Sequence, residues 1–191
     1  MRTYSIRDVI DGLSAMPDAQ VTLEGIHNFL AERPIDADTL GRFHFWDKDH
    51  YTRNLVYKDE RFEVLVVCWE VGQISRIHDH AGQQCWMTVP EGRLVGRNFS
   101  VEMLDDFAGR CRLRESDHFE LSHRLPATVE PEEPIHQVGN PAEFDERAVS
   151  VHIYSKPYDR CRTFCRETDT FREVVLGYTS IDGERVAGSL T

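Results

Sequence analysis

Two segments near the start of the chain space their apolar residues three and four positions apart, as an amphipathic helix does. The first, 5–16, begins with Ser5, whose hydroxyl is suited to capping a helix N-terminus. The second, 22–33, begins with Thr22, which can cap a helix in the same way. A third short helix is expected over about 36–43. The pattern therefore predicts a helical region at the start of the chain.

The pattern changes beyond residue 50, where short runs of β-branched and aromatic residues alternate with turn signals. The run over 61–71 is strongly apolar in its middle, and the run over 83–104 is broken by a Pro-Glu-Gly turn. The stretches 118–131 and 147–157 alternate apolar and polar residues with the period of two that is typical of strands. Many short strands separated by turns predict a sandwich or a barrel. We therefore predict a mainly β chain, with an N-terminal helical cap on a small antiparallel barrel.

Length, charge and cysteine usage narrow the class of protein. The 191 residues favour one domain, with the cap over about 1–47, the barrel over about 50–165 and a C-terminal extension over 166–191. The formal net charge of −11 argues against a nucleic-acid partner, because binding to phosphates needs clustered Lys and Arg. No apolar run is long enough to span a bilayer, so no membrane association is expected. Five cysteines at irregular spacing, without the apolar core of a signal peptide, suit free thiols in the cytoplasm.

The stretch GQISRIHDHAGQQCWMTVPEG contains half of a candidate metal site. His78 and His80 lie two residues apart, so on an extended chain both imidazoles point to the same side and can share a metal ion. A His-x-His pair alone is a weak signal, but Gly72 and Gly92 frame it at a spacing that resembles the first motif of the cupin family. That motif usually has a Glu where this chain has Cys85.

The second cupin motif carries one more His with an Asn four residues later, and PIHQVGN supplies His136 and Asn140 at that spacing. The resemblance thus implies three metal ligands, His78, His80 and His136. Imidazole suits iron, zinc and copper, so the ligand type does not choose the metal. Without a carboxylate ligand, the site would keep the full charge of a divalent ion and attract a thiolate.

Several further stretches resemble one branch of the cupins, the thiol dioxygenases, and within it the cysteine dioxygenase family. YTRNLV, CWEVGQISRIHDH, HQVGN and SVHIYSKPYDRCRTF occur in that family's order and spacing, over about residues 40–165. The resemblance implies a double-stranded β-helix, a jelly-roll-like small barrel, that holds Fe(II) through three histidines. L-cysteine would bind the iron through its thiolate and amine, and O2 would add both atoms to sulfur, giving cysteine sulfinic acid. The resemblance also suggests a monomer.

Three residues match the family's substrate pocket. Arg53 matches the arginine that binds the substrate carboxylate, which a guanidinium can take by two charge-assisted hydrogen bonds. Tyr51 matches a second pocket residue. Trp69 matches a pocket wall, although a plain core position explains it equally well.

Ser150, His152 and Tyr154 alternate by two and therefore share one face of a strand. They match a relay in the family, in which Tyr154 projects its phenol toward the iron, His152 orients the phenol, and Ser150 holds the far ring nitrogen. In animal members, the cysteine at the position of Cys85 forms a thioether to the tyrosine at the position of Tyr154. Because this chain keeps both partners, we expect the same cross-link. Animal members also place a proline with a cis bond where this chain has Lys156; here the bond is trans or the turn is strained.

Other functions stay open at the level of sequence. A related dioxygenase that acts on 3-mercaptopropionate or another small thiol is the nearest alternative, although that group usually has Gln at position 53 and Gly at position 85. A non-catalytic cupin sensor would leave the Ser-His-Tyr relay unexplained. A zinc cupin isomerase or hydrolase would need a carboxylate base, and none is evident near the ligands.

Overall fold

The computed structural model describes residues 2–123, 125–129 and 134–187. Helix α1 (Ile6–Ser14) begins after Ser5, whose Oγ accepts the N–H of Asp8 while the Asp8 carboxylate accepts the N–H of Ser5. Helix α2 (Leu23–Ala31) begins after Thr22, whose Oγ accepts the N–H of Gly25. Both predicted helices and their caps are confirmed, and the third is a 3-10 helix. The short 3-10 helices are η1 (Asp18–Gln20), η2 (Ala37–Phe43) and η3 (Ala142–Phe144).

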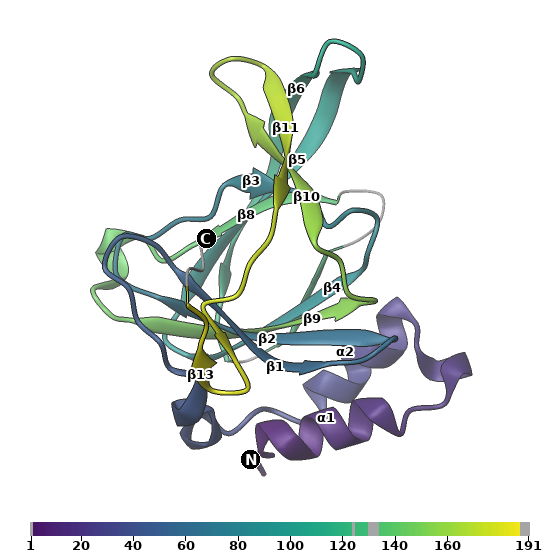
Figure 1. The fold of residues 1–191 in the computed structure, drawn as a ribbon, viewed down its shortest axis with the longest axis vertical. Helices are drawn as coiled ribbons and strands as arrows, with labels where there is room; N and C mark the ends of the chain where they lie inside the picture. The colour runs from purple at the N-terminus through teal and green to yellow at the C-terminus, as the bar shows by residue number, and fades with distance from the viewer. Residues whose placement is uncertain (1, 124, 130–133, 188–191) are drawn as a thin grey trace.

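The strands form two sheets that face each other (Figure 1). One has seven strands in the order β13-β12-β1-β2-β9-β4-β7, and the other closes on itself in the order β10-β11-β6-β5-β8-β3. This is the mainly β, double-stranded β-helix fold with N-terminal helices that the sequence predicted. The strands are β1 (Thr52–Lys58), β2 (Phe62–Trp69), β3 (Ile77–His78), β4 (Cys85–Glu91), β5 (Leu94–Asp105), β6 (Arg110–Leu121), β7 (Ala127–Val129), β8 (Ile135–Gly139), β9 (Ala148–Ser155), β10 (Arg160–Cys165), β11 (Thr170–Val175), β12 (Ser180–Ile181) and β13 (Glu184–Arg185).

Strand β2 is buried on both faces, which explains the apolar run over 64–69; Glu63 is its one charged residue. Its residues Phe62, Val64 and Val66 belong to the cluster that packs beneath α1 and α2, on the outer face of the seven-stranded sheet (Figure 1). Its residues Leu65 and Val67 point to the opposite side, into the barrel. The two helices thus seal one face of the sheet and leave the other to line the site.

A long hairpin of β5 and β6 projects from the barrel beside β10 and β11 (Figure 1). The alternation predicted a strand only from about residue 118, whereas β6 begins at Arg110. The end of the predicted run 118–131 lies outside the described residues. Strands also continue past residue 165, because β11 pairs with β10 and β6, and β12 pairs parallel to β1. The C-terminal segment therefore contributes to both sheets.

Two further observations concern the whole described chain. All five cysteines are free, as expected. Within the described ranges, none of the helices has the length and the apolar character that crossing a bilayer needs.

Candidate metal centre and active site

Three histidines converge inside the barrel. His78 lies at the end of β3, His80 follows two residues later, and His136 comes from β8, where it pairs directly with His78. Nε2 of His136 lies 3.2 Å from Nε2 of His78 and 3.1 Å from Nε2 of His80. Two nitrogens that each bind a metal at about 2.1 Å and at a right angle lie about 3.0 Å apart, so this spacing fits one shared ion. These three side chains form the group that could hold a metal among the described residues.

The environment keeps these imidazoles neutral, as metal binding requires. Burial holds the pKa of His80 and of His136 well below the usual range for histidine, and burial also lowers the pKa of His78. Nδ1 of His78 lies 2.8 Å from the carbonyl oxygen of Arg76, which can only accept, so Nδ1 carries the proton and Nε2 keeps its lone pair. The donor set therefore fits a divalent metal that accepts nitrogen ligands.

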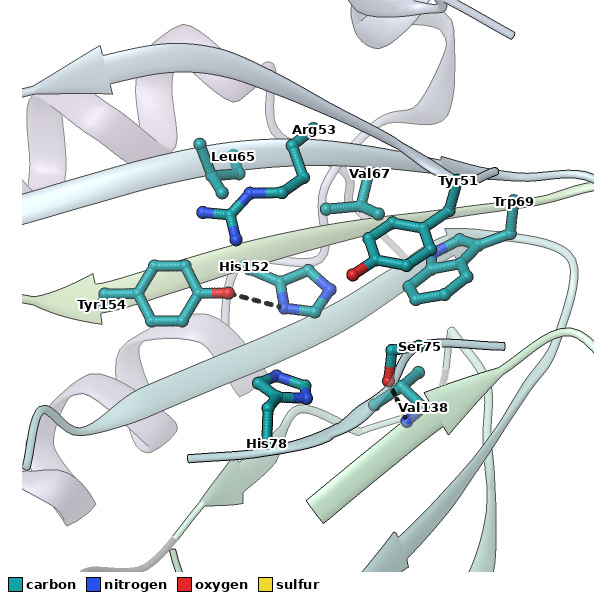
Figure 2. Close-up of a pocket in the computed structure, with 10 residues that line it drawn as sticks. All are labelled: Tyr51, Arg53, Leu65, Val67, Trp69, Ser75, His78, Val138, His152 and Tyr154. Atoms are coloured by element: carbon teal, nitrogen blue, oxygen red, sulfur yellow. Dashed lines mark hydrogen bonds between the residues drawn. The ribbon is translucent and has the colours of Figure 1, made fainter. Parts of the chain in front are cut away.

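A chain of hydrogen bonds runs along β9 beside the three histidines. The indole N–H of Trp69 donates to Oγ of Ser150 at 2.9 Å, and that Oγ lies 2.9 Å from Nε2 of His152. Because Trp69 can only donate, the Ser150 hydroxyl is free to donate its proton to His152. Nδ1 of His152 then carries a proton and faces the Tyr154 oxygen at 3.4 Å (Figure 2).

The protonation states of the groups in this hydrogen-bond chain follow from their burial. Burial lowers the pKa of His152 to about 3, so the ring is neutral near pH 7. Burial raises the pKa of Tyr154 well above its usual value, so the phenol keeps its proton. Since His152 donates to the phenol oxygen, the Tyr154 O–H points away from His152 and can donate toward the pocket.

The three residues predicted to bind substrate lie in the same pocket. Arg53 projects from β1 between Leu65 and Val67 and reaches toward Tyr154 (Figure 2). Burial alone would lower the pKa of Arg53. Nearby phenols and a carboxylate raise it by more, so the pKa is raised overall. Trp69 stacks on Tyr51 with the ring centroids 4.5 Å apart, so it is buried in the core and lines the pocket as well.

The pocket drawn in Figure 2 shares part of its lining with a larger outer cavity. Both spaces are lined by Tyr51, Arg53 and His78, and the outer cavity has a volume of about 780 Å³. Cys161 and Leu176 line the outer cavity as well. A small molecule in the outer cavity would therefore contact both His78 and Arg53.

Cys85 lies opposite Tyr154 in the pairing of β4 with β9, so both side chains point to the same face. The thiol is completely buried, and burial raises its pKa far above the usual value for cysteine. The structure thus brings together all ten residues that the sequence singled out.

The turn after Tyr154 answers a question that the sequence left open. The Ser155–Lys156 bond is trans, and Lys156 takes the left-handed conformation with φ of 67°. A hydrogen bond of 2.7 Å from its N–H to the carbonyl of Arg61 holds it there. A non-glycine residue in this region carries local strain, which the surrounding structure must offset.

Sequence reasoning missed two polar residues near the site. Tyr158 packs edge-on against Tyr154 with the ring centroids 5.2 Å apart, and it approaches His80 as well. Glu63 is completely buried on the face of β2 that points into the barrel. The period of two along β2 would have found Glu63, because an acid at an interior position of an apolar strand is unusual.

Comparison with known proteins gives one consistent result. The family model for cysteine dioxygenase type I matches residues 6–167. Cysteine dioxygenase type 1 of Danio rerio is 28% identical over 196 residues, which cover all of this chain and 94% of that protein. The protein of the same name from Bos taurus is 30% identical over 136 residues, which cover 71% of this chain and 66% of that protein.

Solved structures overlap with part of the chain. A Klebsiella pneumoniae protein with a double-stranded β-helix domain covers 61% of this chain and 81% of its own, with 16% identity and a TM-score of 0.48. A cupin superfamily protein from Desulfitobacterium hafniense covers 66% of this chain and 93% of its own, with 13% identity and a TM-score of 0.45. The family match over most of the chain, together with the three-histidine centre, leads to one conclusion: the chain belongs to the cysteine dioxygenase type I family and is a thiol dioxygenase.

Proposed function

We propose that this enzyme holds Fe(II) through His78, His80 and His136 and adds both atoms of O2 to the sulfur of L-cysteine, giving cysteine sulfinic acid. The observation that carries the proposal is that His78, one member of the three-histidine cluster, lines the same pocket as Arg53. A ferrous ion bound there would supply the redox chemistry that O2 requires and would bind the substrate thiolate. The names of the related proteins support cysteine as the thiol.

Arg53 is suited to bind the carboxylate of the substrate. Its side chain is 13% exposed, and its distance of 3.9 Å to the nearest carboxylate is too long for a hydrogen bond, so its N–H groups stay available. A buried guanidinium can grip a carboxylate through two parallel, charge-assisted hydrogen bonds. Tyr51 and Trp69 form the adjoining wall of the pocket and exclude water from it.

Tyr154 is suited to hold a proton beside the substrate. The hydrogen bonds from Trp69 through Ser150 orient His152 so that it donates to the phenol oxygen. The Tyr154 O–H is then directed toward the pocket. The raised pKa keeps that proton in place. Tyr154 can therefore donate a hydrogen bond to substrate or to oxygen without ionising.

We further propose that Cys85 and Tyr154 become joined by a thioether between the sulfur and the phenol ring. Their direct opposition across β4 and β9 supports the bond. Its formation breaks the S–H bond and a ring C–H bond, and the O2 consumed in the proposed reaction would accept the two electrons and two protons that the chain loses. Intact mass after turnover with iron, cysteine and O2 tests it, with Cys85→Ser as the control that cannot form the bond. A wild-type mass equal to that of the unmodified chain would refute the cross-link.

Oxygen uptake tests the proposed function. We expect iron-loaded protein to consume O2 when L-cysteine is added and to release the sulfinic acid, identified by mass spectrometry. Arg53→Gln should raise KM for L-cysteine much more than KM for cysteamine, which lacks the carboxylate. No uptake at verified iron content would overturn the function, and a higher kcat/KM for 3-mercaptopropionate would overturn the substrate. We also propose that the protein is a cytoplasmic monomer. Size-exclusion chromatography tests its oligomeric state.

A further inference from the structure

A buried charge cluster lies directly behind Arg53. Glu63 is 0% exposed, and its Oε1 accepts a hydrogen bond of 3.0 Å from the phenol of Tyr178. Its Oε2 lies 3.7 Å from Nζ of Lys58, and Lys58 in turn donates to the Tyr178 oxygen at 3.0 Å. The Arg53 guanidinium lies 3.9 Å from Oε1 on the other side. Glu63 is therefore an acid held between two cations.

The local structure of β1 creates this cluster. A β-bulge shifts the register of β1 against β2 between Leu55 and Tyr57, so that Lys58 pairs with Glu63. Without the extra residue, Lys58 would point to the opposite face of the sheet. The bulge thus puts Lys58 on the same face as Arg53, and the sheet adds Glu63 from the neighbouring strand.

Glu63 does not line the substrate pocket, but its charge acts on a residue that does. Arg53 and Lys58 carry two positive charges and Glu63 carries one negative charge, so the three residues together carry one net positive charge. A substrate with one carboxylate brings the group to neutrality. Because Glu63 is buried, its field is screened less than that of a surface acid.

We propose that Glu63 is a positioning residue that sets the electrostatic strength of Arg53 and so limits how tightly the enzyme binds thiols that carry a carboxylate. The proposal rests on the proposed function only in taking Arg53 as the group that binds the carboxylate. The negative charge of Glu63 weakens the attraction of Arg53 for the incoming carboxylate. The positive charge of Lys58 offsets part of this effect. The balance of the two sets KM for carboxylated thiols.

Two matched variants give effects of opposite sign. Glu63→Gln keeps the shape and the acceptor for Tyr178 but removes the charge, so KM for L-cysteine and 3-mercaptopropionate should fall by about threefold to tenfold. Lys58→Gln removes the balancing cation and should raise KM for both thiols. Lys58 is 39% exposed, so it stays solvated when Glu63 is neutralised. Cysteamine has no carboxylate, and its KM, or its Ki against L-cysteine, should change by less than about twofold in either variant.

A second measurement does not depend on turnover. Propionate titrated into the metal-free protein, followed by NMR, should bind more tightly to Glu63→Gln and more weakly to Lys58→Gln, while propylamine serves as the uncarboxylated control. Equal changes for carboxylated and uncarboxylated probes, or changes of the same sign in both variants, would overturn the role of Glu63. Absence of thiol oxidation by the wild type would instead overturn the proposed function, so the two failures are distinguishable.

Discussion

Acidification should destabilise the metal-free protein through His152. Burial lowers the pKa of this imidazole to about 3, whereas in the unfolded chain the pKa is near 6.5. Between these two values the folded protein keeps His152 neutral while the unfolded chain binds a proton. Since the unfolded state then binds more protons, the free energy of unfolding is fully retained above pH 6.5 and is lost as the pH falls toward 3.

The size of the effect follows from the two pKa values. One pKa unit corresponds to about 1.4 kcal/mol. At pH 5 the shifted pKa of His152 alone should therefore lower the free energy of unfolding by about 2 kcal/mol relative to pH 7.5. His80 and His136 shift in the same direction and add to the loss. Such a loss is a large fraction of the stability of an ordinary domain.

Urea unfolding of metal-free wild type and His152→Gln at pH 7.5 and pH 5 measures this contribution. The variant loses the hydrogen bonds to Ser150 and Tyr154 and should be less stable than wild type at pH 7.5. On going to pH 5, the free energy of unfolding of the variant should nevertheless fall by about 2 kcal/mol less than that of wild type, because position 152 no longer titrates. Equal losses in the two proteins would show that His152 is not held neutral by burial, and the reasoning would fail.

Three further predictions concern other parts of the chain. Gly92→Ala should lower the free energy of unfolding by about 2–4 kcal/mol in urea unfolding, because φ is 68° there and an added Cβ would clash with the carbonyl oxygen of Arg147. Arg61→Met should lower the free energy of unfolding by about 1–3 kcal/mol in the same assay, since the guanidinium donates to the carbonyls of Leu13, in the last turn of α1, and Met16, just beyond it; an unchanged midpoint would contradict this. Iodoacetamide near pH 8 should label Cys165 first in peptide mapping, because it is exposed and a hydrogen bond from Thr168 lowers its pKa, and equal labelling of the buried thiols would refute the assignment.

Local signals in the sequence were sufficient where local interactions decide the structure. Ser5 and Thr22 cap their helices through residues three positions along the chain, so the caps could be read directly. The apolar run over 64–69 in β2 reflected burial on both faces. The three-histidine centre was not a local signal, because only the resemblance to a known family linked His136 to His78 and His80.

Most of the missed features depend on long-range pairing. The start of β6 was missed although Arg110-Cys111-Arg112-Leu113-Arg114 alternates polar and apolar residues and buries Cys111 and Leu113, whereas the end of β5 that pairs with it is largely exposed. Tyr178 reaches Glu63 because the segment that contains it follows β11 and precedes β12, which pairs with β1. The bulge that turns Lys58 inward leaves no mark in the sequence pattern. These contacts arise only when the sheet has assembled.

The shortness of β3 has a consequence for how a metal would enter and leave. β3 has two residues and joins β8 through the single pair His78–His136, which lie 58 positions apart in the chain. Backbone hydrogen bonds from Ser75 to Val138 and from Asn140 to Gln73 hold the segment before β3 against β8, so local opening begins at the His78–His136 end of this seam and requires less free energy than unfolding of the barrel. A bound ion would link His78 to His136 across the seam and slow its local opening. We expect amide hydrogens near β3 and β8 to exchange faster than those of β2, and metal loading to remove much of that difference.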